Sequence, residues 1–300
     1  MKNIRVIAAF ACVYVIWGST YLVIRYAIET IPPFLMMGVR SVIAGSVLYL
    51  WSRKASERIL PRHWKPLLII AILFFVCGHG LLAWAQKRVA SGLAAVLIAS
   101  DPLWIALIES FTIRGFQLSV KQKFGLLIGI AGITLMFIPD SSGIGKIDIL
   151  GATIIIVSAV CWSIGAVYSK VAVIPKSASL TAGLQLVLGG VLLIVISFAA
   201  GELENFSLSA VSLRSALSLA YLIVFGSIIT FTAYVWLLQV TSATKVATHT
   251  YVNPIIALIL GSLFASEQFT ITILIASLVI IVSVYLVLQR PRAQPVSTLR

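Results

Sequence analysis

Charged side chains are scarce in this chain of 300 residues. Asp, Glu, Lys and Arg make up 10% of it, 60% of the residues are hydrophobic, and the mean hydropathy is +1.09. Soluble domains carry about 25% charged residues, which keep their surfaces in water. The composition therefore excludes a soluble globular protein and indicates a polytopic membrane protein.

Cysteine and metal-ligand patterns are also sparse. The three cysteines, Cys12, Cys77 and Cys161, all lie inside apolar runs. An odd number at these spacings forms neither a disulfide framework nor a zinc site, and the sequence contains no Walker loop for a nucleotide. We therefore expect packing roles for the cysteines, with no metal, no cofactor and no direct drive by ATP.

What the chain has in quantity is long apolar runs. A hydrocarbon core about 30 Å thick needs roughly 20 apolar residues per helix, and the sequence supplies ten such runs with little left between them. The first, Val6 to Ile28, is too long for the core of a signal peptide and lacks a small-residue cleavage site. An all-α protein is expected, with transmembrane helices over residues 6–28, 34–52, 67–85, 92–112, 124–138, 149–169, 179–200, 215–237, 246–264 and 270–289.

The net charge of +13 is distributed unevenly about these runs. With a cytoplasmic N-terminus, 16 of the 22 basic residues fall in inner segments and six of the nine acidic residues in outer ones. An excess of Lys and Arg marks the cytoplasmic side. We therefore expect a multi-pass protein of the cell (inner) membrane with both termini cytoplasmic, Asp140 to Asp148 outside, the lipid bilayer as partner and no nucleic acid.

One pattern occurs twice in the chain. Ser91 to Pro102 is matched by Ser242 to Pro254, and placing Pro102 over Pro254 sets Asp101 against Asn253. Each copy of the repeat holds five predicted helices, an odd number, so the second copy begins on the other side of the membrane. The sequence therefore predicts two inverted five-helix repeats, over residues 1–143 and 144–290, with a cytoplasmic tail over 291–300.

A polar residue followed by proline is costly inside an apolar run. Proline removes a backbone hydrogen bond, which a membrane helix tolerates where neighbouring helices or a water-lined cavity satisfy the freed carbonyl. Asp101-Pro102 and Asn253-Pro254 are therefore expected to interrupt their helices and to form walls of a central site. Intramembrane carboxylates are functional candidates by default, although Asp101 could instead cap the backbone beside Pro102.

Other polar and aromatic residues inside the predicted spans complete a candidate substrate site. Its members are Trp17, Ser19, Tyr21, Arg40, His79, Trp84, Ser100, Asp101, Pro102, Trp162, Tyr168, His249, Tyr251, Asn253 and Pro254. Structural roles remain open for several of them: helix packing around Gly18 and Ser19, snorkelling of Arg40 or its pairing with Glu29, and a packing role for His79. An ion pair between Arg25 and Glu29, four residues apart, is expected at the rim.

Several motifs match one known family. They are Trp17 to Thr20, Gly38 to Arg40, Ser91 to Ala95 leading to Pro102, and Tyr251 to Pro254 followed by Glu267. On these motifs, residues 5 to 290 resemble the ten-helix EamA-type members of the drug/metabolite transporter superfamily. The resemblance implies outward movement of amino acids and other small metabolites through a cavity between the repeats. The sequence departs from the family pattern at Gly115, where the first repeat often has a glutamate, and at the acidic Asp101.

These observations predict a secondary transporter or exporter of small polar metabolites, most of all amino acids or related compounds, that works by alternating access. The resemblance further implies that helices 1, 3, 4, 6, 8 and 9 surround the cavity, with helices 5 and 10 peripheral. Asp101 could carry a coupled proton, relayed by His79 or His249. The alternatives are a channel-like or facilitative pore and an intramembrane enzyme, and the protein could act as a monomer or a homodimer.

Overall fold

The computed structural model describes residues 2–52, 59–112, 118–137, 148–204, 206–241, 246 and 248–289. Within these ranges the chain is helical and contains no β-strand. The predicted boundary between residues 143 and 144 and the predicted tail from residue 291 lie outside them. Eight of the described helical stretches are long and apolar enough to cross a membrane, and His249–Ala265 is a shorter apolar helix.

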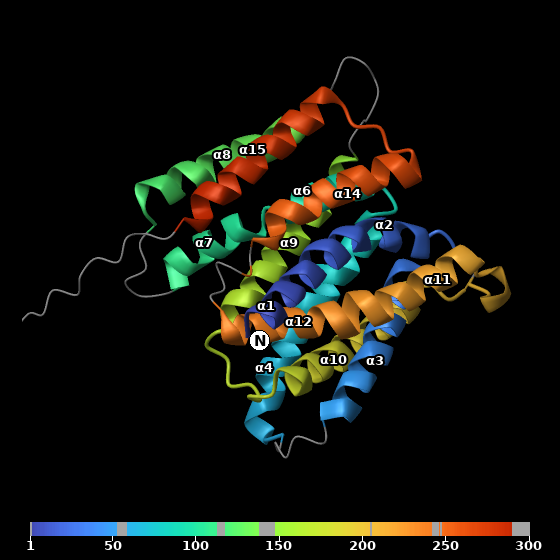
Figure 1. Cartoon of the computed structure of the whole chain (residues 1–300). Helices are drawn as coiled ribbons and strands as arrows, with labels where there is room; N and C mark the ends of the chain where they lie inside the picture. Colours follow the sequence, from blue (N-terminus) through green and yellow to red (C-terminus); the bar gives the residue numbers. More distant parts are fainter. Residues whose placement is uncertain are drawn as a thin grey trace, which may run out of the picture.

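The described elements join into ten rods that follow the predicted runs (Figure 1). The first five are α1 (Lys2–Ala11) continued by η1 (Cys12–Ile16) and α2 (Trp17–Ala27); α3 (Pro33–Ser52); α4 (Pro61–Ala71) continued by η2 (Ile72–Gly80) and α5 (Leu81–Ala85); α6 (Ser91–Ile98) followed by α7 (Asp101–Thr112); and α8 (Val120–Met136). The second five are α9 (Ile149–Ser169); α10 (Ala178–Ala199); α11 (Leu213–Tyr221) continued by η4 (Leu222–Ile229) and α12 (Thr230–Val240); α14 (His249–Ala265); and α15 (Ile271–Leu288). A short 3₁₀ turn, η3 (Leu208–Ala210), precedes α11.

The helix contacts are those of two repeats related by a two-fold axis. Corresponding helices pack on each other: α3 on α10, α6 on α14 and α8 on α15. Other contacts pair the first helix of each repeat with the fourth and third rods of the other repeat. α2 packs on α14 and α9 packs on α6, while α2 packs on α11 and α9 packs on η2. The fold is therefore two five-helix repeats, and five crossings per repeat give them opposite directions in the membrane.

Glycines allow the tightest of these contacts, between α3 and α10. A Cβ atom added to Gly45 would lie 2.8 Å from the carbonyl oxygen of Gly183, and one added to Gly190 would lie 2.9 Å from that of Gly38. The two glycines on each helix are two turns apart, so the antiparallel helices touch at two matched points. Small residues let helix backbones approach closely in lipid, and here they join the two repeats.

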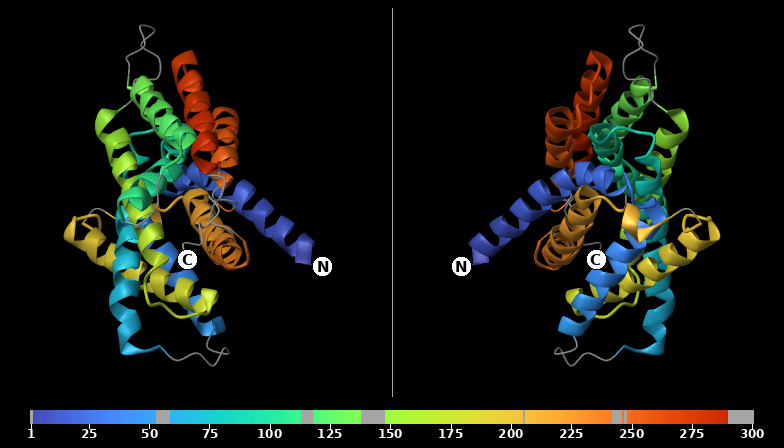
Figure 2. Two further views of the ribbon diagram at one scale, coloured as in Figure 1. Left: turned by 90° about the vertical axis from the view of Figure 1, so that its left-hand side faces the viewer. Right: turned by 90° about the vertical axis from the view of Figure 1, so that its right-hand side faces the viewer.

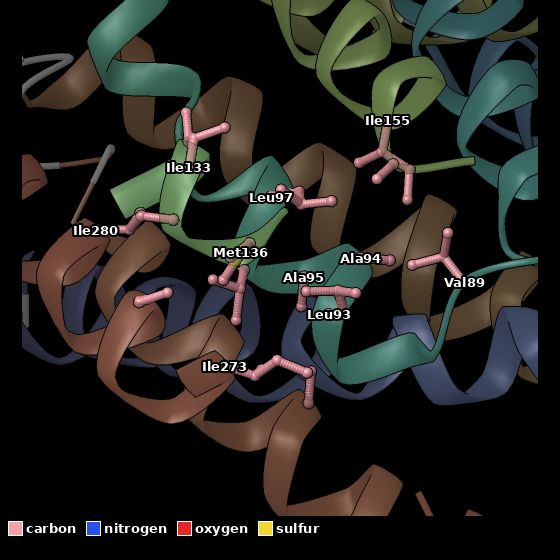
Figure 3. Packing of buried hydrophobic residues seen from close by; sticks show 14 of the residues in the cluster. Val89, Leu93, Ala94, Ala95, Leu97, Ile133, Met136, Ile155, Ile273 and Ile280 are labelled. Atoms are coloured by element: carbon pink, nitrogen blue, oxygen red, sulfur yellow. The ribbon is translucent and has the colours of Figure 1, made fainter. Parts of the chain in front are cut away.

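The pair α8 and α15 lies at one side of the molecule, away from α3 and α10 (Figures 1 and 2). Gly125 and Gly132 face α15, where an added Cβ would meet Val287 and Ile280. The pair joins the rest through a buried apolar cluster in which Ile133 and Ile280 lie near Leu97 of α6 (Figure 3). Helices 5 and 10 are thus peripheral, as the resemblance implied.

Only one of the two proline sites interrupts its helix. In helix 4 the chain leaves the helix at Ala99 and Ser100 and resumes as α7 at Asp101. In helix 9, α14 runs unbroken through Pro254, so the predicted second interruption is wrong. α14 begins at His249 rather than 246, so Pro254 is the sixth residue of the helix and removes one backbone hydrogen bond without breaking it.

Three rods contain π-helical segments that the sequence did not predict: η1, η2 and η4. The last two occupy corresponding places in the two repeats. In each, a backbone carbonyl accepts a hydrogen bond from the first helix of the other repeat: Gly78 O from Ser158 Oγ at 2.7 Å, and Gly226 O from Trp17 Nε1 at 3.2 Å. π-Bulges are frequent at functional sites, and these two lie beside the central cavities.

The two ends of the helix bundle differ in charge. The end called basic here carries Arg5, Arg62, Lys65, Lys121, Lys123 and Lys170, at the starts of odd-numbered rods and the turns beside them. The end called acidic carries Glu29, Asp148, Glu202, Glu204 and Glu267. By the excess of Lys and Arg, the basic end is expected to face the cytoplasm.

Candidate functional site

Two adjoining cavities lie between the repeats. The deep cavity has a volume of about 70 Å³ and is lined from α2, α3, η2, α5, α6, α7, α9 and α14. The wide cavity has a volume of about 620 Å³ and is lined mainly from α7, α9, α10, α12 and α14 toward the basic end. Asp101, Trp162 and His249 line both. These three side chains therefore mark the boundary at which the wide cavity leads into the deep one.

Tryptophan and histidine pair on each side of this boundary. The Trp162 ring stacks on Phe74 with centroids 4.3 Å apart, and His79 lies 5.0 Å from it. From the other repeat, the Trp17 ring lies 4.9 Å from Tyr234 and 5.3 Å from His249. Aromatic faces offer apolar contact and attract cations, so the boundary can hold an organic ammonium group between two aromatic walls.

Asp101 is the acidic group at the boundary. Its residue is 8% exposed, and its Oδ1 atom has no hydrogen-bond partner among the described residues. Its backbone carbonyl accepts from Ser163 Oγ at 3.1 Å, while Ser100 Oγ donates to the Leu97 carbonyl inside the interruption of helix 4. The backbone around Pro102 is therefore satisfied largely by serines, and Asp101 Oδ1 remains free to act on the cavity.

Arg40 is the basic group of the deep cavity. It is 4% exposed, its Nε donates to Ser227 Oγ at 2.8 Å, and its Nη1 lies 3.6 Å from Met37 Sδ. Ser227 belongs to η4, so the guanidinium group crosses from α3 to helix 8 rather than reaching toward the membrane surface. Arg40 therefore neither snorkels to the membrane surface nor pairs with Glu29, the two alternatives that the sequence left open.

Asn253 closes the deep cavity where α14 meets the first helix. With its amide oriented as a donor, its nitrogen lies 2.9 Å from the Tyr14 carbonyl and 3.2 Å from the His249 carbonyl. Tyr14 lies in η1, and its hydroxyl is 2.6 Å from Thr248 Oγ1. Asn253 thus ties the start of α14 to the π-helical segment of helix 1.

An ion pair between a buried glutamate and a partly exposed arginine joins the repeats at the acidic end. Glu267 Oε1 accepts from Arg25 Nη1 at 2.6 Å and from the Ser91 backbone N–H at 2.7 Å, and Oε2 accepts from the Gly92 N–H at 3.0 Å. The Glu267 side chain is 2% exposed. Ala90, at the N-cap of α6, has no side chain that can cap the helix, so Glu267 satisfies its first N–H groups from 176 residues away.

The backbone beside Glu267 is shaped for this contact. Ser266 ends α14 in the left-handed region with φ 51°, a conformation that non-glycine residues adopt at a cost. The Glu267 N–H then returns to the Gly261 carbonyl at 3.1 Å. The turn directs the carboxylate back between α14 and α6, two helical turns beyond Ile98 of the deep cavity toward the acidic end.

The basic end is open by comparison. Glu109 of α7 and Lys170, just after α9, form an ion pair that lines the wide cavity together with Gln185 of α10. Asp101 and Glu109 both line this cavity. The molecule therefore has a central site that is reached through the wide cavity from the basic end.

Nine of the predicted site residues line a cavity. They are Trp17, Tyr21, Arg40, His79, Asp101, Trp162, His249 and Asn253 in the deep cavity, and Pro102 in the wide one. Arg40 brings helix 2 into the wall, beyond the six helices predicted. The peripheral helices α8 and α15 reach only the wide cavity, through Gln122, Val287 and Leu288 at their basic ends.

The other predicted residues have packing roles. Ser19 donates to the Ile16 carbonyl and lies 2.8 Å from the Tyr221 hydroxyl, between helices 1 and 8. Ser100 is fully buried in the interruption of helix 4. The remaining four, Trp84, Tyr168, Tyr251 and Pro254, pack against neighbouring helices and line neither cavity. Residue type alone did not reveal which face of a helix each of them occupies.

The predicted ion pair between Arg25 and Glu29 is also wrong. Arg25 pairs with Glu267, while Glu29 lies 3.5 Å from Arg214. The reason is that α2 ends at Ala27, so Glu29 lies beyond the helix and the spacing of four residues no longer places it on the face of Arg25.

Several cavity residues were missed. Thr20, Ile24, Leu82, Ile98 and Ser158 line the deep cavity, and Gln185 and Tyr234 line the wide one. A signal existed for Ser158, which lies one turn before Trp162 on the same face of α9. None existed for the apolar members, which are like their lipid-facing neighbours in sequence.

Two inverted repeats with two adjoining cavities between them define a membrane transporter of the two-repeat class. The chain belongs to the EamA-like transporter family, whose model matches residues 4–138 and 149–289. It is 33% identical to the uncharacterized inner membrane transporter YedA of Escherichia coli, over 93% of this chain and 89% of that protein.

Two further comparisons agree. The chain is 26% identical to the uncharacterized transporter YoaV of Bacillus subtilis, over 94% of this chain and 96% of that protein. A solved crystal structure matches with a TM-score of 0.66 at 18% identity, over 93% of this chain and 94% of that one. At that identity the structural match shows the shared fold alone.

Proposed function

We propose that this protein is a secondary transporter that moves small polar metabolites, namely amino acids or related compounds, by alternating access across the cell membrane. The observation that carries the proposal is the asymmetry of the central site. Glu267 joins the two repeats on the acidic-end side of the deep cavity, and the deep cavity continues into the wide cavity at the basic end. In this proposal the Glu267 contact is the closed side that alternating access requires.

The positive-inside rule supports an orientation with the basic end and both termini in the cytoplasm. In that orientation the structure is the inward-open state. A solute would enter the wide cavity from the cytoplasm, reach the boundary at Asp101 and Trp162, and leave after the acidic end opens. Such a cycle suits an exporter as well as an exchanger.

The lining supports a small polar solute with an apolar portion. Asp101, Arg40, Asn253 and Ser158 offer charge and hydrogen bonds, while Trp162 and its aromatic neighbours offer apolar contact. A lining of mostly apolar walls with few convergent polar groups is typical of small-molecule sites.

Proton coupling is part of the proposal. Asp101 is an acid buried within the membrane at the boundary of the two cavities, and acids in such places serve proton relays in transporters. A proton and a substrate ammonium group would compete for its carboxylate. Binding of the ammonium group would release the proton, so the movement of substrate and of protons would be coupled.

The test is uptake by the purified full-length protein reconstituted into liposomes, with a panel of labelled amino acids, sugars and amines. We expect uptake of at least one neutral amino acid that saturates with concentration and exceeds that of protein-free liposomes. Uptake that rises linearly with concentration would instead indicate a facilitative pore. An absence of uptake for the whole panel would reject the proposed class of substrate.

A further inference from the structure

We propose that Arg40 and Asp101 recognise the two opposite charges of a zwitterionic substrate, with Arg40 binding its carboxylate and Asp101 its ammonium group. The inference rests on the proposed transport function and names the chemistry that the site selects. It predicts that a free amino acid is the substrate and that the corresponding amine and carboxylic acid are poor substrates.

The first observation is that two buried charges in one cavity lack counter-ions. Both side chains line the deep cavity, with residue exposures of 4% for Arg40 and 8% for Asp101. Among the residues that the structure describes, no opposite charge lies within 4.0 Å of either. A buried charge without a partner is costly, so a ligand that supplies both opposite charges would stabilise the site.

The second observation concerns the free donors and acceptors. Arg40 has five N–H groups, and its hydrogen bonds to described residues use only Nε and Nη1, the latter to a weak thioether acceptor. Nη2 has none of these partners, and Oδ1 of Asp101 has none either. A carboxylate matches the planar fork of a guanidinium group, and an ammonium group matches a free carboxylate oxygen.

The guanidinium group is held in place for this role. Its Nε bond to Ser227 fixes it against η4, and a Cβ added to Gly226 would lie 3.0 Å from Nη2. Gly226 also gives its carbonyl to Trp17 Nε1. The π-helical segment thus provides the close surface on which Arg40 rests, and a preorganised donor loses little freedom on binding.

The positions of the two charges set the orientation of the substrate. Arg40 lines only the deep cavity, whereas Asp101 also lines the wide one. A zwitterion bound to both therefore places its carboxylate inward and its ammonium group at the boundary between the aromatic walls. Its side chain then points into the wide cavity, where Ile105 and Phe231 give apolar contact. We expect broad tolerance for the size of that side chain.

The test is equilibrium binding to the detergent-purified full-length protein of three ligands of one carbon skeleton: L-leucine, 3-methylbutylamine and 4-methylpentanoate. Wild-type protein should bind leucine at least about 10-fold more tightly than either analogue, since each analogue leaves one buried charge unpaired. Arg40→Gln should weaken leucine binding by about 10-fold or more and leave the amine within about twofold. Asp101→Asn should also weaken leucine binding, but should leave the binding of 4-methylpentanoate unchanged.

The two variants are expected to affect different analogues, and this difference separates recognition from misfolding. A misfolded variant would lose binding of all three ligands together. Arg214→Gln is the matched control, since its side chain is half exposed at the acidic end and should change nothing. If both variants keep wild-type discrimination among the three ligands, the charge assignment is wrong. If the wild-type protein transports an amine or a sugar saturably but not leucine, the transport function stands and the zwitterion inference fails.

Discussion

Glu267→Gln is expected to open the deep cavity to the acidic end. The substitution keeps the shape of the side chain but removes the charge that holds Arg25 and the first N–H groups of α6. These contacts join helices 1 and 4 of one repeat to the end of helix 9 in the other. Any state open at the acidic end must separate them, so losing them favours that state.

The expected size of the shift follows from the strength of the lost bonds. Hydrogen bonds to a charged group contribute about 1.5–3 kcal/mol each, and a glutamine retains part of their geometry. A net loss of about 2 kcal/mol moves the balance between the two states roughly 30-fold. The shift is expected to slow the transport cycle, because the variant lingers in the state open at the acidic end.

The measurement is labelling of a cysteine introduced at Ile98, which lines the deep cavity and is partly buried, in a chain whose Cys12, Cys77 and Cys161 are replaced by serine. A membrane-impermeant thiol reagent is added to the outside of intact cells. Labelling should be slow in the Glu267 background and at least about 10-fold faster in Glu267→Gln. Glu29→Gln is the control, since Glu29 is a half-exposed acid at the same end whose partner is Arg214. Equal labelling of both variants would show that Glu267 is not the closing contact.

Asp101→Asn is expected to abolish the response of transport to a proton gradient. One pH unit is worth 1.36 kcal/mol per proton, so one-for-one exchange of a proton for a solute lets wild-type liposomes accumulate the solute about 10-fold. The variant should only equilibrate it. The accumulation ratio is read at its plateau, where a change in rate has no effect.

The other titratable and charged groups around Asp101 come from helices 1, 2, 3, 8 and 9. They are Tyr21 of helix 1, Arg40 of helix 2, His79 of helix 3, Tyr234 of helix 8 and His249 of helix 9. Glu109→Gln is the matched control, because Glu109 is an acid on the same helix that pairs with Lys170 at the mouth of the wide cavity. An Asp101→Asn variant that keeps the wild-type accumulation ratio would show that transport is not coupled through Asp101.

Much of the helical framework was predictable because the bilayer constrains it. An apolar run of fixed length has few alternatives to a helix, and helix 6 was predicted over the same residues, 149–169, that α9 occupies. Matching Pro102 with Pro254 was enough to predict the two-fold relation. Its physical basis, the paired glycines of α3 and α10, was not apparent from either half of the sequence alone.

The closing contact at the acidic end could not have been predicted in the same way. Glu267 and Ser91 are far apart in the sequence, and the capping of α6 by Glu267 depends on how two repeats pack. The nearer partner for Arg25 was Glu29, and local spacing failed because α2 ends first. Likewise, the residue types of η2 do not distinguish a π-helical from an α-helical segment. The hydrogen bond from Ser158 to the Gly78 carbonyl could therefore not be predicted from the sequence.

The central claim is that one site is exposed to the two sides of the membrane in turn, and exchange across the liposome membrane tests it most directly. Liposomes containing the wild-type protein are filled with unlabelled amino acid, and the initial uptake of the same labelled amino acid is measured. A carrier with a single alternating site should take up label several-fold faster into filled than into empty liposomes, because the loaded site returns more readily than the empty one. An initial rate that is the same in filled and empty liposomes would contradict alternating access in this protein.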